Sequence, residues 1–484
     1  MGGLVTEAGY HRFMGTTVNI PRSPDASALL DAIAARGHGV ALVGGAVRDA
    51  LLGRALHDLD AVTDASPVEV RAACEGASWC RRVYDVGERF GTLGVVLTDG
   101  TVIEVSRLRG DAGPGAAFAD AYALDAGLRD FTVNAIAVEW PSLTLLDPAN
   151  GRADIAACVL RAPGDPAARF AEDPLRVLRA ARFVAELGFT VEPGTESAAT
   201  AIAPELAHVA AERVRDELTT LLTAPRAGEG LAFALRTEAL AVVLPEVAAL
   251  DGVVQPTFHD LDVFAHTIQT VDGAPASPVL RWAALLHDIG KAPCRTVEAG
   301  GRIRFFGHTQ QGAEMADAIC RRLRFSNAER TAVVHLVREH MRLGELAVDN
   351  PKAVDRAVRR LDLWASDAEN PHLLVSAEDA IELTLADFSA TAHRAEAEAV
   401  RERLAAAVAA SRERGTRVRV ASPLSGRELM DALGLEEGPA VGAAMRAVVD
   451  AVAEGRIAAG DRAAALEVAR AAAGRRCEGG ESER

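Results

Sequence analysis

Lysine is almost absent from this sequence. Of its 52 basic side chains, only Lys291 and Lys352 are lysines, so arginine carries nearly all of the positive charge. The formal net charge is nevertheless −16. We do not expect so acidic a chain to coat nucleic acid indiscriminately, although the net charge does not argue against a local basic groove. Arginine binds phosphate well, but so strong a preference for arginine in an alanine-rich chain is more typical of GC-rich coding.

Cysteine and long apolar runs are also scarce. Six cysteines are scattered without any C-x-x-C pair, which argues against a disulfide or zinc framework and fits a reducing cytoplasm. No apolar run is long enough to cross a bilayer, so we expect no membrane association. At 484 residues the chain is too long for a single core, and several domains are expected.

The periodic segments predict two architectures in succession. In the N-terminal part we expect strands at residues 58–63, 93–98, 101–107 and 133–139, separated by glycine-rich turns. From about residue 170 onward the pattern is almost wholly helical, with breaks at prolines. The predicted fold class is therefore α+β first and all-α afterwards.

The stretch GRALHDLDAVT, residues 53–63, places Asp58 and Asp60 two positions apart in a predicted strand. Side chains two apart in a strand point to the same face. Two neighbouring carboxylates repel each other unless a cation lies between them or one of them is protonated. The pair therefore predicts a metal site.

An apolar strand, VALV, leads directly into the turn GGAVRD, residues 44–49. Gly44 and Gly45 let backbone N–H groups approach phosphate oxygens, and Arg48 can add a side-chain contact. Nucleotidyl transfer requires such a phosphate cradle beside a metal-binding carboxylate pair, because metal ions activate the attacking hydroxyl and stabilise the departing pyrophosphate.

The stretch LVGGAVRDALLGRALHDLDAVTDASPVEV resembles the opening motif of the polymerase-β-like nucleotidyltransferases. Within them it is similar to the class II CCA-adding tRNA nucleotidyltransferases and bacterial poly(A) polymerases. The resemblance implies Mg²⁺ held by Asp58 and Asp60, with Glu104 of TVIEVSRLR as a third catalytic carboxylate; an exposed edge-strand glutamate is the alternative for Glu104. LRDFTVNAIAV resembles the ribose- and phosphate-binding motif, which implies nucleotide contacts from Arg129, Asp130 and Asn134.

The chain departs from the family pattern at two places. The ribose- and phosphate-binding motif usually begins Arg-Arg-Asp, whereas here Leu128 precedes Arg129. The loop after Arg109 usually carries acidic and basic residues, whereas here residues 110–123 read GDAGPGAAFADAYA. The resemblance therefore does not extend to one expected substrate contact or to any step of the reaction that depends on this loop.

The stretch FAEDPLRVLRAARFVAEL, residues 170–187, combines an acceptor-only Asp173 with a donor-only Arg176. Cytosine and adenine both present an amino donor beside an acceptor, whereas guanine and uracil present the reverse order. The pair can therefore select CTP and ATP. The stretch resembles the family's protein-templating motif, which implies that Asp173 and Arg176 read the base beside Arg179; a helix N-cap at Asp173 is the structural alternative. Glu212 and Arg213 of the next family helix would support the pocket.

Further along the chain, histidines recur at wide helical intervals around an adjacent His-Asp pair on an apolar helix, a pattern that indicates a buried metal site. The pattern resembles the HD phosphohydrolase superfamily. The resemblance implies a divalent metal bound by His266, His287, Asp288 and Asp387, with His308 and His340 binding a second metal or a phosphate. Such a metal would activate water against a phosphoester.

Together these resemblances imply four domains: a nucleotidyltransferase head at 22–150, a helical nucleotide- and RNA-binding neck at 151–255, an HD domain at 256–390 and a C-terminal helical domain at 391–484. The expected function is addition of C, C and A to the tRNA 3′ end from CTP and ATP, with contacts to the acceptor arm; the oligomeric state is left open. One alternative is a poly(A) polymerase or an enzyme that adds only CC or only A. Another is an RNA-binding HD phosphohydrolase that has lost transferase activity.

Overall fold

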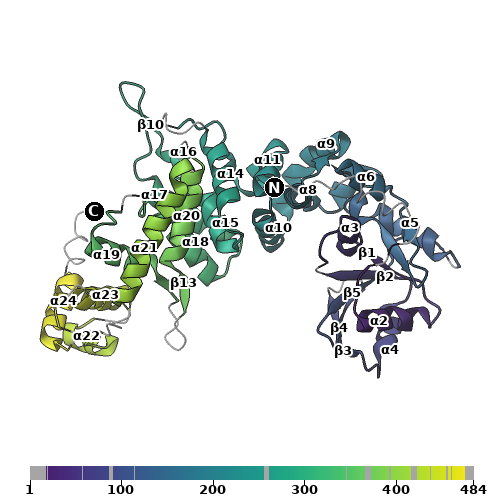
Figure 1. Cartoon of the computed structure of the whole chain (residues 1–484), viewed down its shortest axis with the longest axis horizontal. Coiled ribbons are helices and arrows are strands. Elements are labelled where there is room, and N and C mark those ends of the chain that lie inside the picture. Colours follow the sequence, from purple (N-terminus) through teal and green to yellow (C-terminus); the bar gives the residue numbers. More distant parts are fainter. Residues whose placement is uncertain are drawn as a thin grey trace. The chain divides into compact units, whose positions relative to one another are not determined.

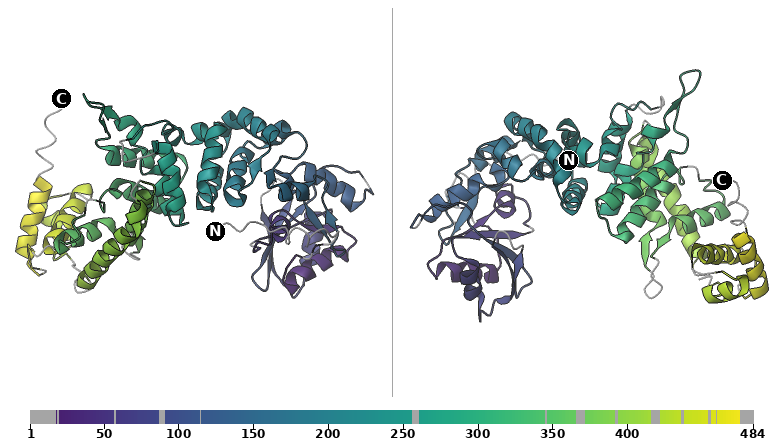
Figure 2. Two further views of the ribbon diagram at one scale, coloured as in Figure 1. Left: turned by 45° about the horizontal axis from the view of Figure 1, so that its top comes forward. Right: turned by 180° about the vertical axis from the view of Figure 1, so that it is seen from behind.

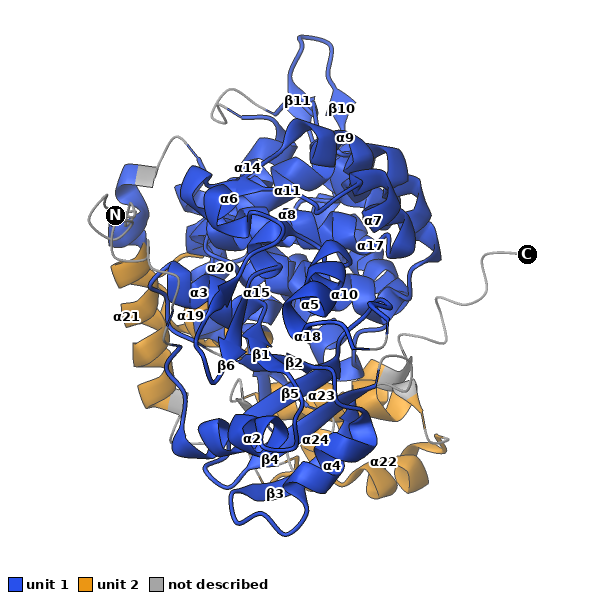
Figure 3. Cartoon of the chain, turned by 90° about the vertical axis from the view of Figure 1, so that its right-hand side faces the viewer, with its two compact units in different colours: residues 1–344, 361–400 blue, residues 345–360, 401–484 orange. Residues whose placement is uncertain are grey.

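The computed structural model describes residues 18, 20–56, 58–86, 91–113, 115–255, 261–344, 346–365, 372–391, 394–415, 422–435, 438–453, 456–458 and 460–474. The chain divides into two compact units (Figure 3). Residues 1–344 and 361–400 form the first unit, and residues 345–360 and 401–484 form the second. The four predicted domain boundaries stay predictions.

The N-terminal part contains a seven-stranded sheet (Figure 1). Its strands lie in the order β3-β4-β5-β2-β1-β6-β7, and β2 and β5 run parallel while the other neighbours are antiparallel. The strands are β1 (Val40–Val43), β2 (Leu59–Thr63), β3 (Cys80–Val86), β4 (Thr92–Leu97), β5 (Val102–Arg107), β6 (Ala137–Trp140) and β7 (Leu145–Leu146).

Alternation along β1 divides the core between the two faces of the sheet. Val40 and Leu42 pack with α2 (Pro24–Ala34) and α4 (Pro67–Cys74), whereas Ala41 and Val43 pack with Tyr122 of α5 (Phe118–Gly127). Serine N-caps begin both α2 and α4. Asp60 lies between Leu59 and Ala61, which face α2 and α4, so the alternation places it on the α5 face.

Three of the four predicted strands are confirmed to within one residue, as β2, β4 and β5. The prediction for 133–139 is wrong at its start, because residues Thr132–Asn134 form the 3-10 turn η2 and β6 begins only at Ala137. In that turn the backbone N–H of Ala135 donates to the carbonyl of Thr132 instead of to a neighbouring strand. Apolar composition alone did not distinguish this turn from a strand.

Helices dominate the rest of the first unit, as the amino-acid sequence predicts. Figure 2 shows from two more sides that helical regions follow the mixed head. The segment after the sheet contains α6 (Gly151–Ala157), α7 (Pro166–Glu172), α8 (Arg176–Leu187), α9 (Pro193–Ile202), η3 (Ala203–His208), α10 (Ala211–Thr223), α11 (Ala227–Arg236), α12 (Ala239–Val243) and α13 (Pro245–Ala248), with β8 (Val159–Leu160) parallel to β9 (Thr190–Val191). Close packing of α11 on α8 requires Gly230, where a Cβ would lie 2.6 Å from the Ala181 carbonyl oxygen.

A second helical cluster of the first unit surrounds the histidines. It contains α14 (Val263–Gly273), α15 (Pro278–Leu286), α16 (Lys291–Cys294), α17 (His308–Arg322), α18 (Asn327–Glu339) and α20 (Ala377–Ser389), with the short hairpins β10 (Thr296–Val297)–β11 (Ile303–Arg304) and β12 (Leu363–Trp364)–β13 (Leu373–Val375). Helix α14 packs against α15 and α20, and α17 packs against α18.

The elements described in the second unit are all helices. This unit contains most of α19 (Pro351–Leu361) and of α21 (Ala397–Gly415, after the turn η4, Arg394–Glu396), together with α22 (Gly426–Leu433), α23 (Pro439–Ala453) and α24 (Arg462–Gly474). Leu429, Val448 and Ala465 are among the residues of a small core shared by α22, α23 and α24. Among the helices described, none has the length and apolarity needed to span a membrane.

Candidate functional site

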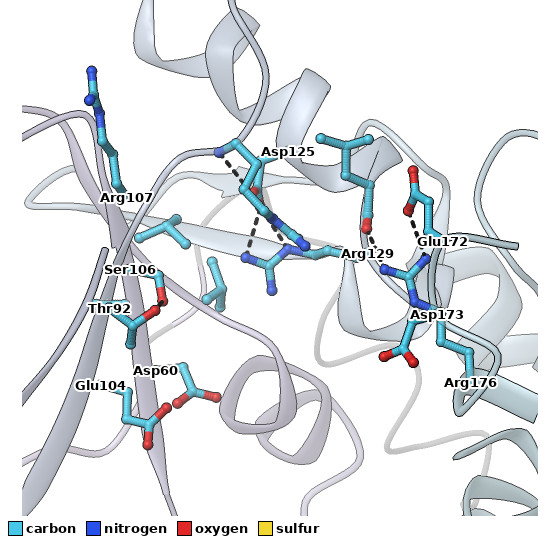
Figure 4. Close-up of a pocket in the computed structure, with 15 residues that line it drawn as sticks. Asp60, Thr92, Glu104, Ser106, Arg107, Asp125, Arg129, Glu172, Asp173 and Arg176 are labelled. Carbon is cyan, nitrogen blue, oxygen red and sulfur yellow. Dashed lines mark hydrogen bonds and ion pairs between the residues drawn. The ribbon is translucent and has the colours of Figure 1, made fainter. Parts of the chain in front are cut away.

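A cavity of about 690 Å³ opens where the sheet meets the first helices that follow it. Figure 4 shows Asp60 and Glu104 on one side of it and Asp173 and Arg176 on the other, with Arg129 between them. The full lining is Val43, Asp60, Ala61, Val62, Thr92, Glu104, Ser106, Arg107, Arg109, Asp125, Leu128, Arg129, Glu172, Asp173 and Arg176. Two motifs that the sequence separates by more than a hundred residues therefore line one cavity.

Asp60 and Glu104 are neighbours across the parallel pair β2 and β5. Burial and the negative charges of Glu104 and Asp58 together raise the pKa of Asp60 to about 6, against the opposing positive charge of Arg129. Concentrated negative charge of this kind disfavours ionisation unless a cation is bound. Carboxylate oxygens are the ligands that Mg²⁺ prefers, so these acids suit a magnesium site.

Asp58 lies one residue before β2 and is exposed. It is near enough to act on the charge of Asp60 but does not line the cavity. Among the described residues, the sets of three or more donor atoms within 4.8 Å of one another contain neither Asp58, Asp60 nor Glu104. Joint metal binding by these three acids stays a prediction.

The glycine turn lies directly beside the acids. Gly44 has a φ of +72°, which favours glycine. A Cβ at Gly44 would lie 3.4 Å from Asp60 Oδ2 and 3.9 Å from Arg129 Nη1. The turn, the acid and one arginine nitrogen thus converge at one point, where the small size of glycine leaves the backbone open to a phosphate.

Four of the predicted nucleotide contacts form an internal network and do not line the cavity. Arg48 Nη1 donates to Asn134 Oδ1 at 2.9 Å, and Asn134 Nδ2 donates to Asp130 Oδ1 at 3.2 Å. Arg179 Nη2 donates to Asp130 Oδ2 at 2.6 Å. Burial alone would raise the pKa of Asp130, but Arg179 and the surrounding hydrogen bonds hold it below its usual range. Direct nucleotide binding by these residues stays a prediction.

The two candidate base readers, Asp173 and Arg176, both line the cavity but do not pair with each other. Asp173 Oδ2 accepts from Arg213 Nη2 at 2.7 Å, and Oδ1 accepts from the Leu175 backbone N–H at 3.2 Å. Asp173 follows α7 as its C-cap, and the N-cap of α8 is Leu175. The predicted N-cap position is therefore wrong by two residues, although the Asp173 side chain does accept from the Leu175 N–H in the turn before α8.

Arg176 is held by different partners. Its Nη1 lies 3.2 Å from Glu172 Oε2, and its Nη2 donates to the Leu128 carbonyl at 3.1 Å. Burial lowers the pKa of the Arg176 guanidinium. Where the family usually has arginine, Leu128 thus lines the cavity and positions Arg176 through its backbone.

Asp125, which belongs to none of the sequence motifs, lines the cavity on α5 and pairs with Arg109 and Arg129. An acid four residues before Arg129 was the available signal, since that spacing places two side chains on one face of a helix. The contact with Arg109 depends on the tertiary fold and had no sequence signal.

The six predicted HD residues converge in the helical cluster. Their donor atoms form two groups within 4.8 Å, one of His266, His287 and Asp387 and the other of Asp288, His308 and His340. Asp288 falls in the second group, but it also lies beside the first, so the predicted first ligand set of His266, His287, Asp288 and Asp387 stays a prediction. Asp288 Oδ2 lies 3.1 Å from His287 Nε2 and its Oδ1 lies 3.7 Å from His308 Nε2, so the carboxylate can bridge two cations.

Backbone carbonyls orient the histidines. The Nδ1 atoms of His287, His308 and His340 lie 2.7, 2.9 and 2.7 Å from carbonyl oxygens three residues earlier. His287 Nε2 is buried and lies 3.1 Å from Asp288 Oδ2, whereas the buried Nε2 atoms of His308 and His340 have no hydrogen-bond partner. A backbone-anchored Nδ1–H leaves the Nε2 lone pair available for a metal, and these orphaned atoms therefore fit divalent metal binding.

The pKa values of two groups in the cluster also favour metal binding. Burial and the nearby His287 lower the pKa of His340 to about 4, so its ring is neutral at pH 7. Burial would raise the pKa of Asp288, but His287 and Lys291 hold it well below its usual range. A neutral His340 and an ionised Asp288 are the forms that bind metals. Burial lowers the pKa of His287, but Asp288 raises it above its usual value, so His287 must release its proton when a metal binds.

Comparison with protein families matches three segments of the chain. Residues 40–161 match the poly A polymerase head domain, residues 188–250 match the probable RNA and SrmB-binding site of polymerase A, and residues 264–387 match the HD domain.

Among curated relatives, an A-adding tRNA nucleotidyltransferase of Deinococcus radiodurans is 37% identical over 350 residues, which cover 68% of this chain and 75% of that protein. A CC-adding tRNA nucleotidyltransferase of Thermus thermophilus is 34% identical over 441 residues, which cover 88% and 92% of the two chains. A CCA-adding enzyme of Geobacillus thermodenitrificans is 40% identical over 219 residues, 44% of this chain and about half (52%) of that enzyme.

Solved structures give the same fold. The CCA-adding enzyme of Bacillus stearothermophilus in complex with CTP superposes with a TM-score of 0.60 at 24% identity and covers 94% of this chain and 100% of that one. A CCA-adding enzyme in complex with ATP gives a TM-score of 0.57 at 19% identity, with coverage of 96% and 97%. The predicted polymerase-β-like head with following helical domains is thereby confirmed. The chain belongs to the family of tRNA nucleotidyltransferases and poly(A) polymerases, with an HD domain after the neck.

Proposed function

We propose that this protein is a tRNA nucleotidyltransferase that adds C, C and A to the tRNA 3′ end from CTP and ATP in the cytoplasm. One observation carries the proposal: the acidic pair Asp60 and Glu104 and the base-reading pair Asp173 and Arg176 line the same cavity. A triphosphate bound at the acids and the glycine turn can therefore place its base at α7 and α8.

In the proposed reaction the 3′ hydroxyl of tRNA attacks the α-phosphate of the nucleotide. A new P–O bond forms, the bond to the β-phosphate oxygen breaks, and pyrophosphate leaves. Asp58 and Asp60, with Glu104 beside them, would hold Mg²⁺, and the bound metal would lower the pKa of the attacking hydroxyl and offset the charge of the leaving group. The open backbone at Gly44 and Gly45 cradles the triphosphate.

Base selection follows from the donor and acceptor inventory. Asp173 accepts a hydrogen bond from the amino group of cytosine or adenine, and Arg176 donates to the adjacent ring acceptor. Guanine and uracil would place a carbonyl against Asp173 and an N–H against Arg176. Unpaired buried polar groups make such a mismatch costly, so GTP and UTP are rejected.

The test uses purified protein and tRNA that lacks its 3′ end. Each nucleotide is supplied singly and then CTP with ATP, and product lengths are read. We expect two additions with CTP alone and three with both nucleotides. Addition of only C or only A would identify a partial enzyme, as named for two relatives, and long A tails would identify a poly(A) polymerase. No extension would contradict the proposal.

We further propose that the HD cluster is a metal-dependent phosphohydrolase site, because the buried Nε2 atoms of His308 and His340 lack hydrogen-bond partners there. His266, His287 and Asp387 would hold one divalent cation, and Asp288, His308 and His340 a second. The metals supply an activated water against a phosphoester. An assay with a 2′,3′-cyclic nucleotide and added metal, together with metal analysis of the protein, tests this; absence of both turnover and bound metal would leave only a structural role.

A further inference from the structure

Asp125 is a buried carboxylate that the proposed chemistry does not yet use. Its side chain is 1% exposed and lies between two arginines of the cavity wall. Oδ1 accepts from the backbone N–H of Arg109 at 3.2 Å and from its Nε at 2.9 Å. Oδ2 lies 2.9 Å from both Nε and Nη2 of Arg129, a paired contact that fixes the plane of the guanidinium. Figure 4 shows Asp125 and Arg129 joined above Asp60.

These contacts determine which arginine nitrogens remain for a ligand. Arg129 keeps Nη1, which lies 3.9 Å from the point where a Cβ on Gly44 would stand. Asp60 Oδ2 lies 3.4 Å from the same point. The remaining nitrogen of Arg129 is therefore directed at the glycine turn beside the proposed magnesium ligand.

Arg109 contributes from the other side. It follows β5, the strand that carries Glu104, and its side chain is 38% exposed in the cavity lining. Only its backbone N–H and Nε contact Asp125, so its two terminal nitrogens take no part in that contact. Two guanidinium groups this close repel each other, and the carboxylate between them offsets that repulsion.

The carboxylate is ionised at neutral pH. Burial alone would raise the pKa of Asp125, but the charges of Arg129 and Arg109 and their hydrogen bonds lower it. Asp125 is also poorly placed to touch a substrate, because both of its oxygens are already occupied by arginines. It therefore acts through Arg109 and Arg129.

We propose that Asp125 is a positioning residue that holds Arg109 and Arg129 toward the β- and γ-phosphates of the incoming nucleotide, the part that leaves as pyrophosphate. The inference rests on the proposed function and extends it to the leaving group. Donors fixed in advance at a developing charge stabilise the transition state without reorganising. A purely structural alternative is that Asp125 only fastens the loop after Arg109 to α5.

Pyrophosphate inhibition separates the two interpretations. For Asp125→Asn we expect kcat/KM for addition to tRNA lacking its 3′ end to fall on the order of 10²-fold, as on removal of an oriented donor. The fall should be equal for CTP and ATP, because both nucleotides share the triphosphate. The inhibition constant of pyrophosphate should rise on the order of tenfold, whereas Asp125→Glu should restore part of both losses.

Arg109→Gln keeps the test decisive if Asp125→Asn does not fold, because Arg109 is partly exposed. Arg109→Gln should raise the inhibition constant of pyrophosphate. Adding Asp125→Asn to this variant should raise that constant by a smaller factor than Asp125→Asn does in the wild-type protein. The matched control is Asp154→Asn, since Asp154 is also buried and accepts from Thr132 Oγ1 at 2.7 Å but does not line the cavity. It should leave pyrophosphate inhibition unchanged.

Several results would overturn the proposal: unchanged pyrophosphate inhibition in folded Asp125→Asn or in Arg109→Gln, or an equal change in Asp154→Asn. Failure of the proposed function is a different result, because the wild-type protein would then not extend tRNA at all.

Discussion

The ionised carboxylate of Asp60 is needed for the proposed metal site but destabilises the metal-free fold. Burial and the neighbouring Glu104 raise the pKa of its carboxyl to about 6, against 3.8 when unperturbed. Between these pH values the folded state binds more protons at Asp60 than the unfolded state does, so the stability of the metal-free protein falls as pH rises through that window. A shift of this size corresponds to roughly 2–3 kcal/mol above pH 6.

Asp60→Asn should therefore stabilise the metal-free head at pH 8 while removing nucleotide transfer. At pH 8 with a chelator, we expect hydrogen exchange in residues 59–63 to be slower in Asp60→Asn than in the wild-type protein. This difference in exchange rate should vanish near pH 4. Asp85→Asn is the control, because Asp85 is 73% exposed and pairs with Arg71 on the surface. Faster exchange in Asp60→Asn at pH 8 would mean that the acid stabilises the fold even without metal.

Asp173 is the residue at which nucleotide choice should be separable from catalysis. It lines the cavity opposite the acids and carries no proposed metal contact. Asp173→Ala should reduce the preference for CTP and ATP over GTP and UTP by at least about tenfold, in line with the loss of one discriminating polar contact. Incorporation of each nucleotide supplied singly measures this preference, and an unchanged preference in Asp173→Ala would refute base reading by Asp173.

Among the helices, the close packing of α17 against the residues just before α16 fixes the position of His308 in the second HD ligand group. A Cβ at Gly290 would lie 2.1 Å from the His308 carbonyl oxygen, so a side chain there must displace the start of α17. His308 is the first residue of that helix. The close packing of two elements thus decides where one ligand stands.

Gly290→Ala should weaken metal binding by Asp288, His308 and His340 at least about tenfold, because metal sites tolerate little displacement of a ligand. It should also lower the thermal midpoint. Metal titration measures the first effect, with Gly300→Ala as the matched control since a Cβ there meets nothing within 4 Å. Equal metal affinity in both variants would show that α17 accommodates the methyl group without moving His308.

At the scale of the whole molecule, the transferase cavity and the HD cluster share no residue. Their chemistry should therefore be separable by single substitutions. Asp288→Asn should lose bound metal and phosphoesterase activity while tRNA extension changes by less than about twofold, since substitutions at sites without shared partners usually act independently.

Asp58→Ala is the reciprocal variant. It should lose tRNA extension by at least about 10³-fold, as expected when a ligand of a catalytic metal is removed, and keep the metal content of the HD cluster. Loss of both activities in either variant would show that the two sites depend on each other. Near-normal extension by Asp58→Ala would contradict its metal role.

Local sequence signals were enough to predict the chemistry-bearing residues and much of the local structure around them. Asp60, Gly44, Asp173 and the His287–Asp288 pair were recognisable because turn glycines, strand alternation and helix periodicity are local properties that a few residues express. Strands β2, β4 and β5 followed from the same local signals.

Only the tertiary structure decided which of these residues share a cavity. Arg48 and Arg179 turned out to bond Asn134 and Asp130, and Asp125 turned out to hold Arg109 and Arg129. The division of the HD ligands into two groups was likewise decided by packing between helices. Side-chain partners across distant segments depend on how whole elements pack, and residue spacing along one chain does not contain that information.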